Sequence, residues 1–368
     1  MSRTPMKPFA LLIKPTSADC NLRCEYCFYL EKRALYPSDG KHRMNDETLR
    51  TLLKRYFATS QPVYSMIWQG GEPTLMGTSF FRRVIDEQKK LAPRGAQIAN
   101  ALQTNATLVQ SDLATLIAQY RFLVGCSLDG PADLHDVYRR TASRRESYTK
   151  VVHGIRTLQS HGVPLNGTVL VSTANVDSPL RVYRHLLELG IHHIQFIPCV
   201  EFDNLGNSCS FTISGKQWGT FLLSIFEFWY TSHRRYVSIR NFDSLIAKMA
   251  GIANTECRLC HQCDQYLVVE YNGDVYPCDF FVGEQYLLGN LFDDAFESIV
   301  QSSRYQDFVS RKNSLPEQCV ACTYYRLCMG DCPKFRAGAG GEAPSWLCDG
   351  WSMFFETAKE RLESLSIY

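Results

Sequence analysis

CNLRCEYC, residues 20–27, sets three cysteines in the spacing C-x-x-x-C-x-x-C directly after the apolar run FALLI at residues 9–13. Three thiolates hold a four-iron cluster but fill only three of its four iron sites, so one iron stays open to a small molecule. A structural zinc site would be expected to close its fourth position with a nearby Cys or His, and the nearest candidate, His42, lies beyond a charged stretch. The spacing therefore favours a catalytic cluster over structural zinc.

The composition describes an ordinary globular protein. The chain has 368 residues, 45% hydrophobic content and a net charge of +2, which allows one large core with an appendage and gives no strong bias toward nucleic acid or membranes. Residues 1–10 lack the long apolar region of a signal peptide, and no apolar run reaches membrane-spanning length. We expect a cytoplasmic monomer whose 15 cysteines are reduced and serve in part as ligands.

Short β-rich runs alternate with amphipathic helical patterns up to about residue 235. The predicted strands are 10–14, 64–69, 98–104, 122–128, 164–172 and 193–198. The predicted helices include 47–56, 79–91, 111–118, 148–159 and 179–189. Six βα units predict a parallel sheet, which either closes into a barrel or stops at six units and stays open on one side. In both cases functional residues gather where the strands end.

The second predicted strand ends in QGGEP, residues 69–73. Two glycines let the backbone approach a ligand closely, Glu72 offers a carboxylate to an amine, and the proline fixes the exit of the turn. Polar groups also stand at later strand ends, in QTN at 103–105, SLDG at 127–130 and IQF at 194–196. Each of these three could equally be a capping or turn segment.

The cysteine loop, with Tyr26 before its last cysteine, and the GGEP turn together resemble the radical S-adenosylmethionine (SAM) enzymes. The resemblance implies an α/β fold, a partial (β/α)6 TIM barrel, with a [4Fe-4S] cluster on Cys20, Cys24 and Cys27. It also implies that SAM binds the open iron and is cleaved to a deoxyadenosyl radical. The SAM pocket would then include Tyr29, Gly70, Gly71, Glu72, Ser127, Arg139 and Ile194, and the substrate side Gln69 and Gln103. Arg140 is the alternative to its neighbour Arg139.

The last third of the chain is dense in cysteine. Nine of the fifteen lie there, at positions 257, 260, 263, 278, 319, 322, 328, 332 and 348. So loop-rich a segment needs metal to support its fold. The Asn272-Gly273 turn between residues 266–271 and 275–276 predicts a β-hairpin that brings Cys263 and Cys278 together. Two zinc-ribbon sites are the alternative, because Cys-x-x-Cys pairs suit tetrahedral zinc.

This arrangement resembles the SPASM extension of radical SAM enzymes, which implies two auxiliary [4Fe-4S] clusters. The first would take Cys257, Cys263, Cys278 and Cys332, and the second Cys319, Cys322, Cys328 and Cys348. Cys260 is left over, and the regular spacing of Cys257, Cys260 and Cys263 also allows Cys260 to replace Cys257 as the ligand. The isolated Cys126, Cys199 and Cys209 are more typical of small core residues.

Asp279, in YPCDF at 276–280, stands next to one proposed ligand and could act as a general base or only cap a turn. Over nearly its whole length, from LIKP at 12–15 to the last cysteines, the chain resembles the anaerobic sulfatase-maturating enzymes. That resemblance implies oxidation of a Cys or Ser side chain in an unfolded sulfatase to Cα-formylglycine, with Asp279 as the base. The departures are the extra Cys260, Ala106 after Gln-Thr-Asn, and a shorter spacing between Cys332 and Cys348.

The implied partners are a sulfatase chain with a Cys/Ser-x-Pro/Ala-x-Arg motif and a low-potential electron donor such as flavodoxin or ferredoxin. The implied layout is a radical SAM partial barrel at 1–235, a SPASM domain with the auxiliary clusters at 236–348 and a C-terminal helix at 349–368.

Three other functions remain open from the sequence. A SPASM maturase that cross-links or epimerises a ribosomally made peptide is the nearest, although only about eight residues precede the first predicted strand here, and many such maturases carry a recognition domain there. An electron carrier would leave the GGEP turn and the open iron without a purpose. A zinc-dependent scaffold is the third.

Overall fold

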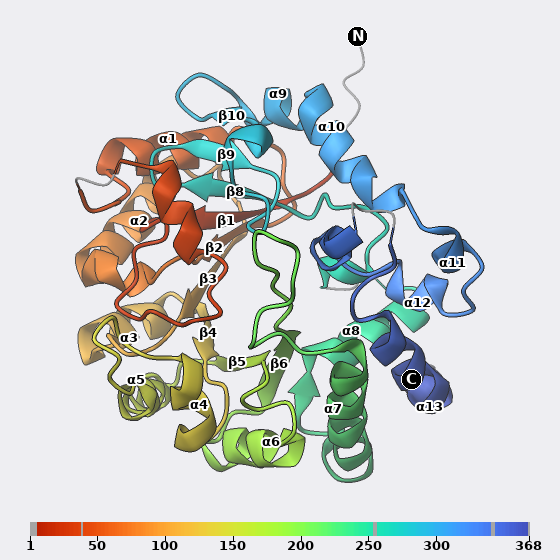
Figure 1. Ribbon diagram of the computed structural model, residues 1–368. Coiled ribbons are helices and arrows are strands. Elements are labelled where there is room, and N and C mark those ends of the chain that lie inside the picture. Colours follow the sequence, from red (N-terminus) through yellow and green to blue (C-terminus); the bar gives the residue numbers. More distant parts are fainter. Residues whose placement is uncertain (1–5, 38–39, 253–255, 340–342, 367–368) are drawn as a thin grey trace.

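The computed structural model describes residues 6–37, 40–252, 256–339 and 343–366, and one curved sheet runs through them (Figure 1). Its strands follow the order β10-β9-β8-β1-β2-β3-β4-β5-β6-β7. The strands are β1 (Ala10–Lys14), β2 (Tyr64–Trp68), β3 (Ile98–Thr104), β4 (Leu123–Ser127), β5 (Leu165–Val171), β6 (His193–Pro198), β7 (Ser238–Ile239), β8 (Tyr266–Glu270), β9 (Asp274–Tyr276) and β10 (Gly289–Asn290).

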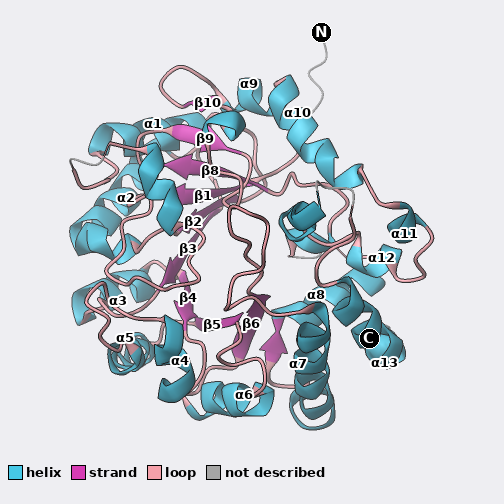
Figure 2. Ribbon diagram, viewed as in Figure 1, coloured by secondary structure: helices cyan, strands magenta, loops and turns pink. Residues whose placement is uncertain are grey.

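The strands from β1 to β6 pair in parallel, each with the next along the chain, as the six predicted βα units require. Helices cover the outer face of this part of the sheet and leave one side open (Figures 1 and 2). The prediction of a partial barrel is therefore confirmed. The covering helices are α1 (Asp46–Phe57), α2 (Gly77–Leu91), α3 (Ser111–Gln119), α4 (Ala132–Tyr138), α5 (Tyr148–Ser160) and α6 (Pro179–Glu188).

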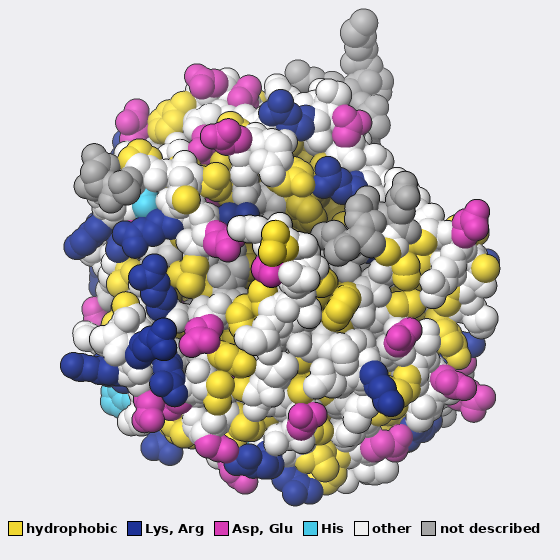
Figure 3. Space-filling view, viewed as in Figure 1, with side chains coloured by type: hydrophobic (Ala, Val, Ile, Leu, Met, Phe, Trp, Pro, Cys, Tyr) yellow, Lys and Arg dark blue, Asp and Glu magenta, His cyan; other side chains and the backbone are white. Residues whose placement is uncertain are grey.

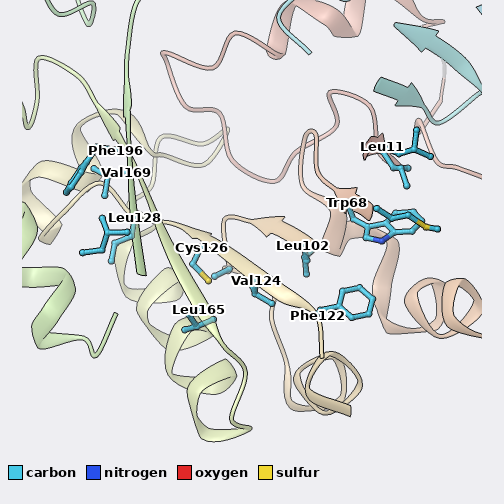
Figure 4. Packing of buried hydrophobic residues seen from close by; sticks show 14 of the residues in the cluster. Leu11, Trp68, Leu102, Phe122, Val124, Cys126, Leu128, Leu165, Val169 and Phe196 are labelled. Atoms are coloured by element: carbon cyan, nitrogen blue, oxygen red, sulfur yellow. The ribbon is translucent and has the colours of Figure 1, made fainter. Parts of the chain in front are cut away.

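Side-chain alternation along the strands separates a hydrophobic core from a polar interior. Ile13, Trp68 and Leu102 occupy one row of the register, are fully buried or nearly so, and belong to the hydrophobic core. Figure 4 shows Trp68 and Leu102 in this core. The next residue along each strand points the other way. Lys14 and Gln103 stand there, on the inner face where the strands end, so the sheet presents polar groups to the barrel interior.

The sheet continues beyond the six parallel strands at both edges. β7 pairs with β6 a few residues after position 235, where the predicted barrel domain ends. At the other edge β8 pairs with β1 in parallel over five residues, and β9 returns antiparallel to β8. Gly273 has φ 91° in the connecting turn, so the predicted Asn272-Gly273 hairpin is confirmed. This hairpin attaches the cysteine-rich segment to the first strand.

The C-terminal part packs against the open side of the barrel (Figure 1). The close approach of α13 to α7 requires glycine, because a Cβ on Gly219 would lie 2.6 Å from the Gly350 carbonyl oxygen. The remaining helices are α7 (Gly215–Phe228), α8 (Arg240–Met249), α9 (Phe296–Gln301), α10 (Ser303–Ser310), α11 (Glu317–Val320), α12 (Tyr325–Cys328) and α13 (Cys348–Leu365).

The surface carries charges of both signs, as the net charge of only +2 predicts (Figure 3). On the face viewed in Figure 3, Lys and Arg side chains gather on the left of the view, and the centre is mostly uncharged. Within the described ranges, no helix combines the length and the apolar character that crossing a membrane requires.

Candidate functional site

The three N-terminal cysteines lie in the loop after β1, at the end of the sheet where the parallel strands finish. The backbone N–H of Leu22 donates to Cys20 Sγ at 3.3 Å, and Asn105 Nδ2 donates to the same sulfur at 3.7 Å. Burial raises the pKa of the Cys24 thiol to about 12. Thiols in such surroundings become thiolates when a positively charged group such as iron binds them, so the loop fits a metal cluster.

A buried ion pair between Arg139 and Asp129 holds the cysteine loop in place through Tyr26. Arg139 Nε donates to Asp129 Oδ2 at 2.8 Å, and the hydroxyl of Tyr26 donates to the same carboxylate oxygen. The guanidinium lies 5.4 Å from the centroid of the Tyr26 ring. Arg140 turns away and donates to the Asp136 carbonyl. Of the two arginines considered from the sequence, Arg139 is therefore the one beside the cysteines.

The glycine turn contacts the residue that precedes Cys20. Gly70 and Gly71 have φ 99° and 48°, in the left-handed region. A Cβ on Gly71 would lie 2.0 Å from the Asp19 carbonyl oxygen, and that oxygen accepts the backbone N–H of Glu72 at 2.9 Å. The turn and the cysteine loop are thus one packed unit.

The Glu72 carboxylate connects the glycine turn to the end of β3 through hydrogen bonds. Its oxygens accept from the hydroxyl of Thr74 at 2.6 Å, the hydroxyl of Thr104 at 2.7 Å and the backbone N–H of Asn105 at 2.7 Å. The residue is fully buried, and burial raises the pKa of its carboxyl group. These hydrogen bonds fix the orientation of the carboxylate, and Oε2 accepts only one of them. The expected contact of Glu72 with the amine of a ligand stays a prediction.

Two further predicted residues meet on the inner face, and one does not. Gln103 Nε2 donates to Ser127 Oγ at 3.1 Å. Ile194 pairs with Gly167, where a Cβ would meet Leu186 of α6 at 3.5 Å. Neighbours across a strand pair share a face, so the side chain of Ile194 lies on the helix side and not in the barrel interior. The alternation of side chains along the strand predicts the helix side for Ile194. It places the neighbouring residue, Gln195, on the inner face of the sheet.

Asp279 lies at the junction of the barrel and the cysteine-rich segment. Gln69 Nε2 donates to its Oδ2 at 3.0 Å, and Lys14 Nζ lies 3.7 Å from the same oxygen. The Asp279 side chain is 15% exposed, whereas that of Lys14 is 2% exposed and lies 4.5 Å from the centroid of the Tyr29 ring. Sequence reasoning gave Lys14 no role. A lysine that ends an apolar strand was the available signal, because burial of a lysine requires a partner.

Tyr29 connects the cysteine loop to the hairpin. Its hydroxyl donates to Glu270, the last residue of β8, and both side chains are buried. Burial raises the pKa of both groups. Glu270 was also missed from the sequence, since its partner lies far away along the chain.

The C-terminal cysteines surround two cavities. The empty space is about 440 Å³ in the first and about 320 Å³ in the second, including volume open to solvent. Their linings contain the two predicted ligand sets: Cys257, Cys263, Cys278 and Cys332 in the first, and Cys319, Cys322, Cys328 and Cys348 in the second. Among the described residues, no three or more Cys, His, Asp or Glu side chains are close enough to hold one metal ion. Four thiols that line one cavity are the donor set that a [4Fe-4S] cluster takes.

Cys257 and Cys260 differ in position. The Tyr266 hydroxyl lies between Cys257 Sγ and Cys278 Sγ, at 4.0 and 3.6 Å, on the wall of the first cavity. Cys260 stands outside that lining, where its sulfur accepts from Gln265 Nε2 at 2.7 Å. Cys126 and Cys199 are buried and Cys209 is half-buried.

Comparisons with known proteins agree with this geometry. Residues 15–186 match the radical SAM superfamily and residues 257–323 match the SPASM iron-sulfur cluster-binding domain. A serine-type anaerobic sulfatase-maturating enzyme from Bacteroides thetaiotaomicron is 37% identical over 95% of this chain and 89% of its own length. A cysteine-type enzyme from Clostridium perfringens is 33% identical over 97% and 98%. The solved structure of native anSMEcpe with bound AdoMet and Cp18Cys peptide has a TM-score of 0.91 at 31% identity, covering 98% of this chain and 99% of that chain.

Proposed function

The chain belongs to the anaerobic sulfatase-maturating enzymes, and we infer from this membership that it oxidises a Cys or Ser side chain of a sulfatase to Cα-formylglycine. One observation carries the inference. The likeness covers nearly the full length of proteins with this activity, including a structure that contains AdoMet and a Cys peptide. The GG turn and Asp279 lie at the same end of the sheet as the cysteine loop.

We propose that Cys20, Cys24 and Cys27 hold the [4Fe-4S] cluster that binds SAM. When bound, the cluster and SAM would together supply a deoxyadenosyl radical that can take a hydrogen atom from the substrate Cβ. Arg139 and Tyr26 hold the loop in place through Asp129. The proposed pocket for SAM comprises the predicted residues Tyr29, Gly70, Gly71, Glu72, Ser127 and Arg139, with Ile194 contributing from its strand.

Asp279 is the proposed general base, which accepts the proton of the substrate thiol or hydroxyl. Gln69 and Lys14 both approach Oδ2 and orient the carboxylate. The other oxygen, Oδ1, faces Cys278 Sγ at 3.7 Å and is the one on which the proton would be taken. Gln103 lies across the barrel interior and belongs to the proposed substrate side. The base therefore stands between the substrate and the first auxiliary cavity.

The two cavities are the proposed sites of auxiliary [4Fe-4S] clusters, which makes three clusters in the protein. The oxidation must release one electron after the hydrogen and the proton have left, and clusters at these sites would receive it. Four cysteines surround each cavity, so no iron would stay open for direct binding of the substrate. In the first cavity Cys257, and not Cys260, is the proposed ligand.

The proposed macromolecular substrate is an unfolded sulfatase segment with a Cys/Ser-x-Pro/Ala-x-Arg motif, and the proposed reductant is a flavodoxin or ferredoxin. Relatives of both the serine type and the cysteine type match the chain, so both target residues are candidates here. Testing the two peptides side by side determines which one this enzyme accepts.

The test is mass spectrometry of synthetic Cys-x-Pro-x-Arg and Ser-x-Pro-x-Arg peptides after anaerobic incubation with reconstituted protein, SAM and a strong reductant. We expect an aldehyde product together with deoxyadenosine. Asp279→Asn should reduce the rate of aldehyde formation about 10²- to 10⁴-fold, while SAM cleavage persists. Asp293→Asn, at an exposed carboxylate of the same segment, is the matched control and should change neither product.

Two results would count against this function. Deoxyadenosine without any change in either peptide would favour a SPASM maturase that modifies a different peptide. Absence of SAM cleavage in an iron-replete sample would contradict radical SAM chemistry in this chain altogether.

A further inference from the structure

The first auxiliary cavity has a buried lysine in its wall. Lys312 belongs to a short 3-10 helix (Arg311–Asn313), is 2% exposed and lines the same cavity as Cys257 and Cys263. Its Nζ donates to the carbonyl oxygens of Cys257 at 3.2 Å and Arg258 at 2.6 Å. A lysine this deeply buried normally has a negative partner.

The two hydrogen-bond acceptors of Lys312 are neutral carbonyl groups. The negative groups that act on its ammonium are the sulfurs of the surrounding cysteines and the Asp331 carboxylate. Arg258 also lines this cavity, but its Nε lies 2.6 Å from a carboxylate oxygen of Glu256. The ammonium of Lys312 and anionic sulfur in this cavity stabilise each other.

The second cavity differs from the first in its charged residues. Its described lining includes Asp331 and contains neither lysine nor arginine. Asp331 Oδ2 accepts from Ser345 Oγ at 2.8 Å and from Trp351 Nε1 at 3.1 Å, and Oδ1 lies 4.0 Å from Arg258 Nη1 of the first cavity. Lys312 is therefore a cation of the first cavity that has no counterpart in the described lining of the second.

We propose that Lys312 raises the reduction potential of the iron–sulfur cluster in the first auxiliary cavity. Reduction adds one negative charge to a group already held by four thiolates, and a buried cation at its wall stabilises the reduced form. The electron released beside Asp279 is then stabilised at the first cavity. This inference rests on the cluster sites given under the proposed function.

A matched control exists on the same turn. Lys248 Nζ donates to the Leu259 carbonyl at 2.9 Å, next to the two carbonyls that Lys312 binds, but Lys248 does not line the cavity. Loss of either lysine removes a contact that holds residues 257–259. Only loss of Lys312 removes charge from the cavity wall.

The experiment is an anaerobic redox titration of the reconstituted full chain, followed by electron paramagnetic resonance, with iron content measured first. The signal of the first cavity is identified by its loss in Cys278→Ala. In Lys312→Gln, which keeps a hydrogen-bond donor, we expect the equilibrium constant for one-electron reduction of that cluster to fall at least about tenfold, ~59 mV. Lys312→Met should do the same if the Gln variant does not fold. Lys312→Arg and Lys248→Gln should retain the wild-type potential.

Three outcomes overturn the inference. An unchanged reduction potential in an iron-replete Lys312→Gln or Lys312→Met variant would show that the charge of Lys312 does not affect this cluster. A shift of the same size in Lys248→Gln shows that loosening of the turn, and not charge, changes the potential. Retention of every cluster signal in Cys278→Ala, with undiminished iron, overturns the proposed cluster site itself and is thereby distinguishable from the other two.

Discussion

Gly71 satisfies two separate demands of the cysteine loop at the residue scale. Its φ of 48° lies in the left-handed region, and a Cβ at this position would lie 2.0 Å from the Asp19 carbonyl oxygen. The contacting atom belongs to the backbone one residue before Cys20, so it has little freedom to move. The geometry of the metal-binding loop and the absence of a side chain at Gly71 are therefore coupled.

Gly71→Ala is expected to displace the loop and to remove most of the iron of the cluster proposed to be held by Cys20, Cys24 and Cys27. The strain alone costs about 1–2 kcal/mol, and the clash adds to it. Gly95→Ala is the control, because Gly95 has φ 80° but no atom within 4 Å of its Cβ position. Iron per chain and the rate of SAM cleavage measure the effect. Full SAM cleavage by Gly71→Ala would be inconsistent with this coupling.

His135 provides a residue-scale dependence of stability on pH. It is fully buried, its Nδ1 accepts the backbone N–H of Asp129 at 3.2 Å, and its Nε2 lies 3.1 Å from Ser147 Oγ. Burial and the nearby Arg139 lower the pKa of His135, Asp129 and Asp136 oppose the shift, and the net result is a pKa of about 4. The folded state therefore holds a neutral imidazole under the ion pair that supports the cysteine loop.

The resulting prediction follows from linkage. Above the unfolded pKa of about 6.5 both states are neutral, and stability is lost as pH falls from there toward 4, because only the unfolded state binds the proton. Between pH 7 and pH 5 the wild-type protein should lose roughly 2 kcal/mol more free energy of unfolding than His135→Asn, which keeps an acceptor for Asp129 N–H. Urea unfolding at both pH values measures the difference, and parallel losses in the two proteins would refute the assignment.

The hairpin of β8 and β9 is the element that joins the two metal-binding regions. β8 continues the barrel sheet by pairing Lys14 of β1 with its own Glu270, and Asp279 follows shortly after β9. Pairing in this register places Asp279 within reach of Lys14 and Gln69. One hairpin thus carries the proposed base and one proposed ligand of the first auxiliary cavity.

Cys257 and Cys260 lie just before the hairpin, in different positions relative to the first cavity, and iron binding can test this difference. Cys257→Ala should lose the cluster of the first cavity, because its sulfur stands on the wall beside Tyr266. Cys260→Ala should retain that cluster, since Cys260 is not part of the lining and its sulfur accepts from Gln265, which is part of it. Iron content and the charge-transfer absorption of the two variants give the answer. Loss of iron only in Cys260→Ala would reverse the ligand assignment.

Local patterns explain why much of this could be predicted from the sequence. The cysteine spacings, the Asn272-Gly273 turn and the six alternating units each depend on residues close together in the chain. The contact of Lys14 with Asp279 depends on the pairing of β8 with β1. These strands are far apart in the chain, so the periodicity of the sequence around either strand does not reveal that they pair. The donors that occupy the Glu72 carboxylate also come partly from another strand end, at Thr104 and Asn105. Ile194 is different, since strand alternation alone places it on the helix side.

At the scale of the whole molecule, one continuous sheet carries the cysteine loop and leads into the cysteine-rich segment. The glycine contact between α7 and α13 holds the C-terminal part against the barrel. Asp279 lies at this junction, between the end of the barrel and the first auxiliary cavity. The architecture therefore brings the proposed sites of hydrogen, proton and electron removal into neighbouring parts of one structure.

The most direct test of this account is to supply Cys-x-Pro-x-Arg and Ser-x-Pro-x-Arg peptides deuterated at Cβ of the target residue and to measure the mass of the deoxyadenosine produced. We expect deuterium in the deoxyadenosine, formed in step with an aldehyde in the accepted peptide. Deoxyadenosine that gains no deuterium from either peptide, in a sample that cleaves SAM, would contradict the conclusion that this enzyme oxidises that carbon.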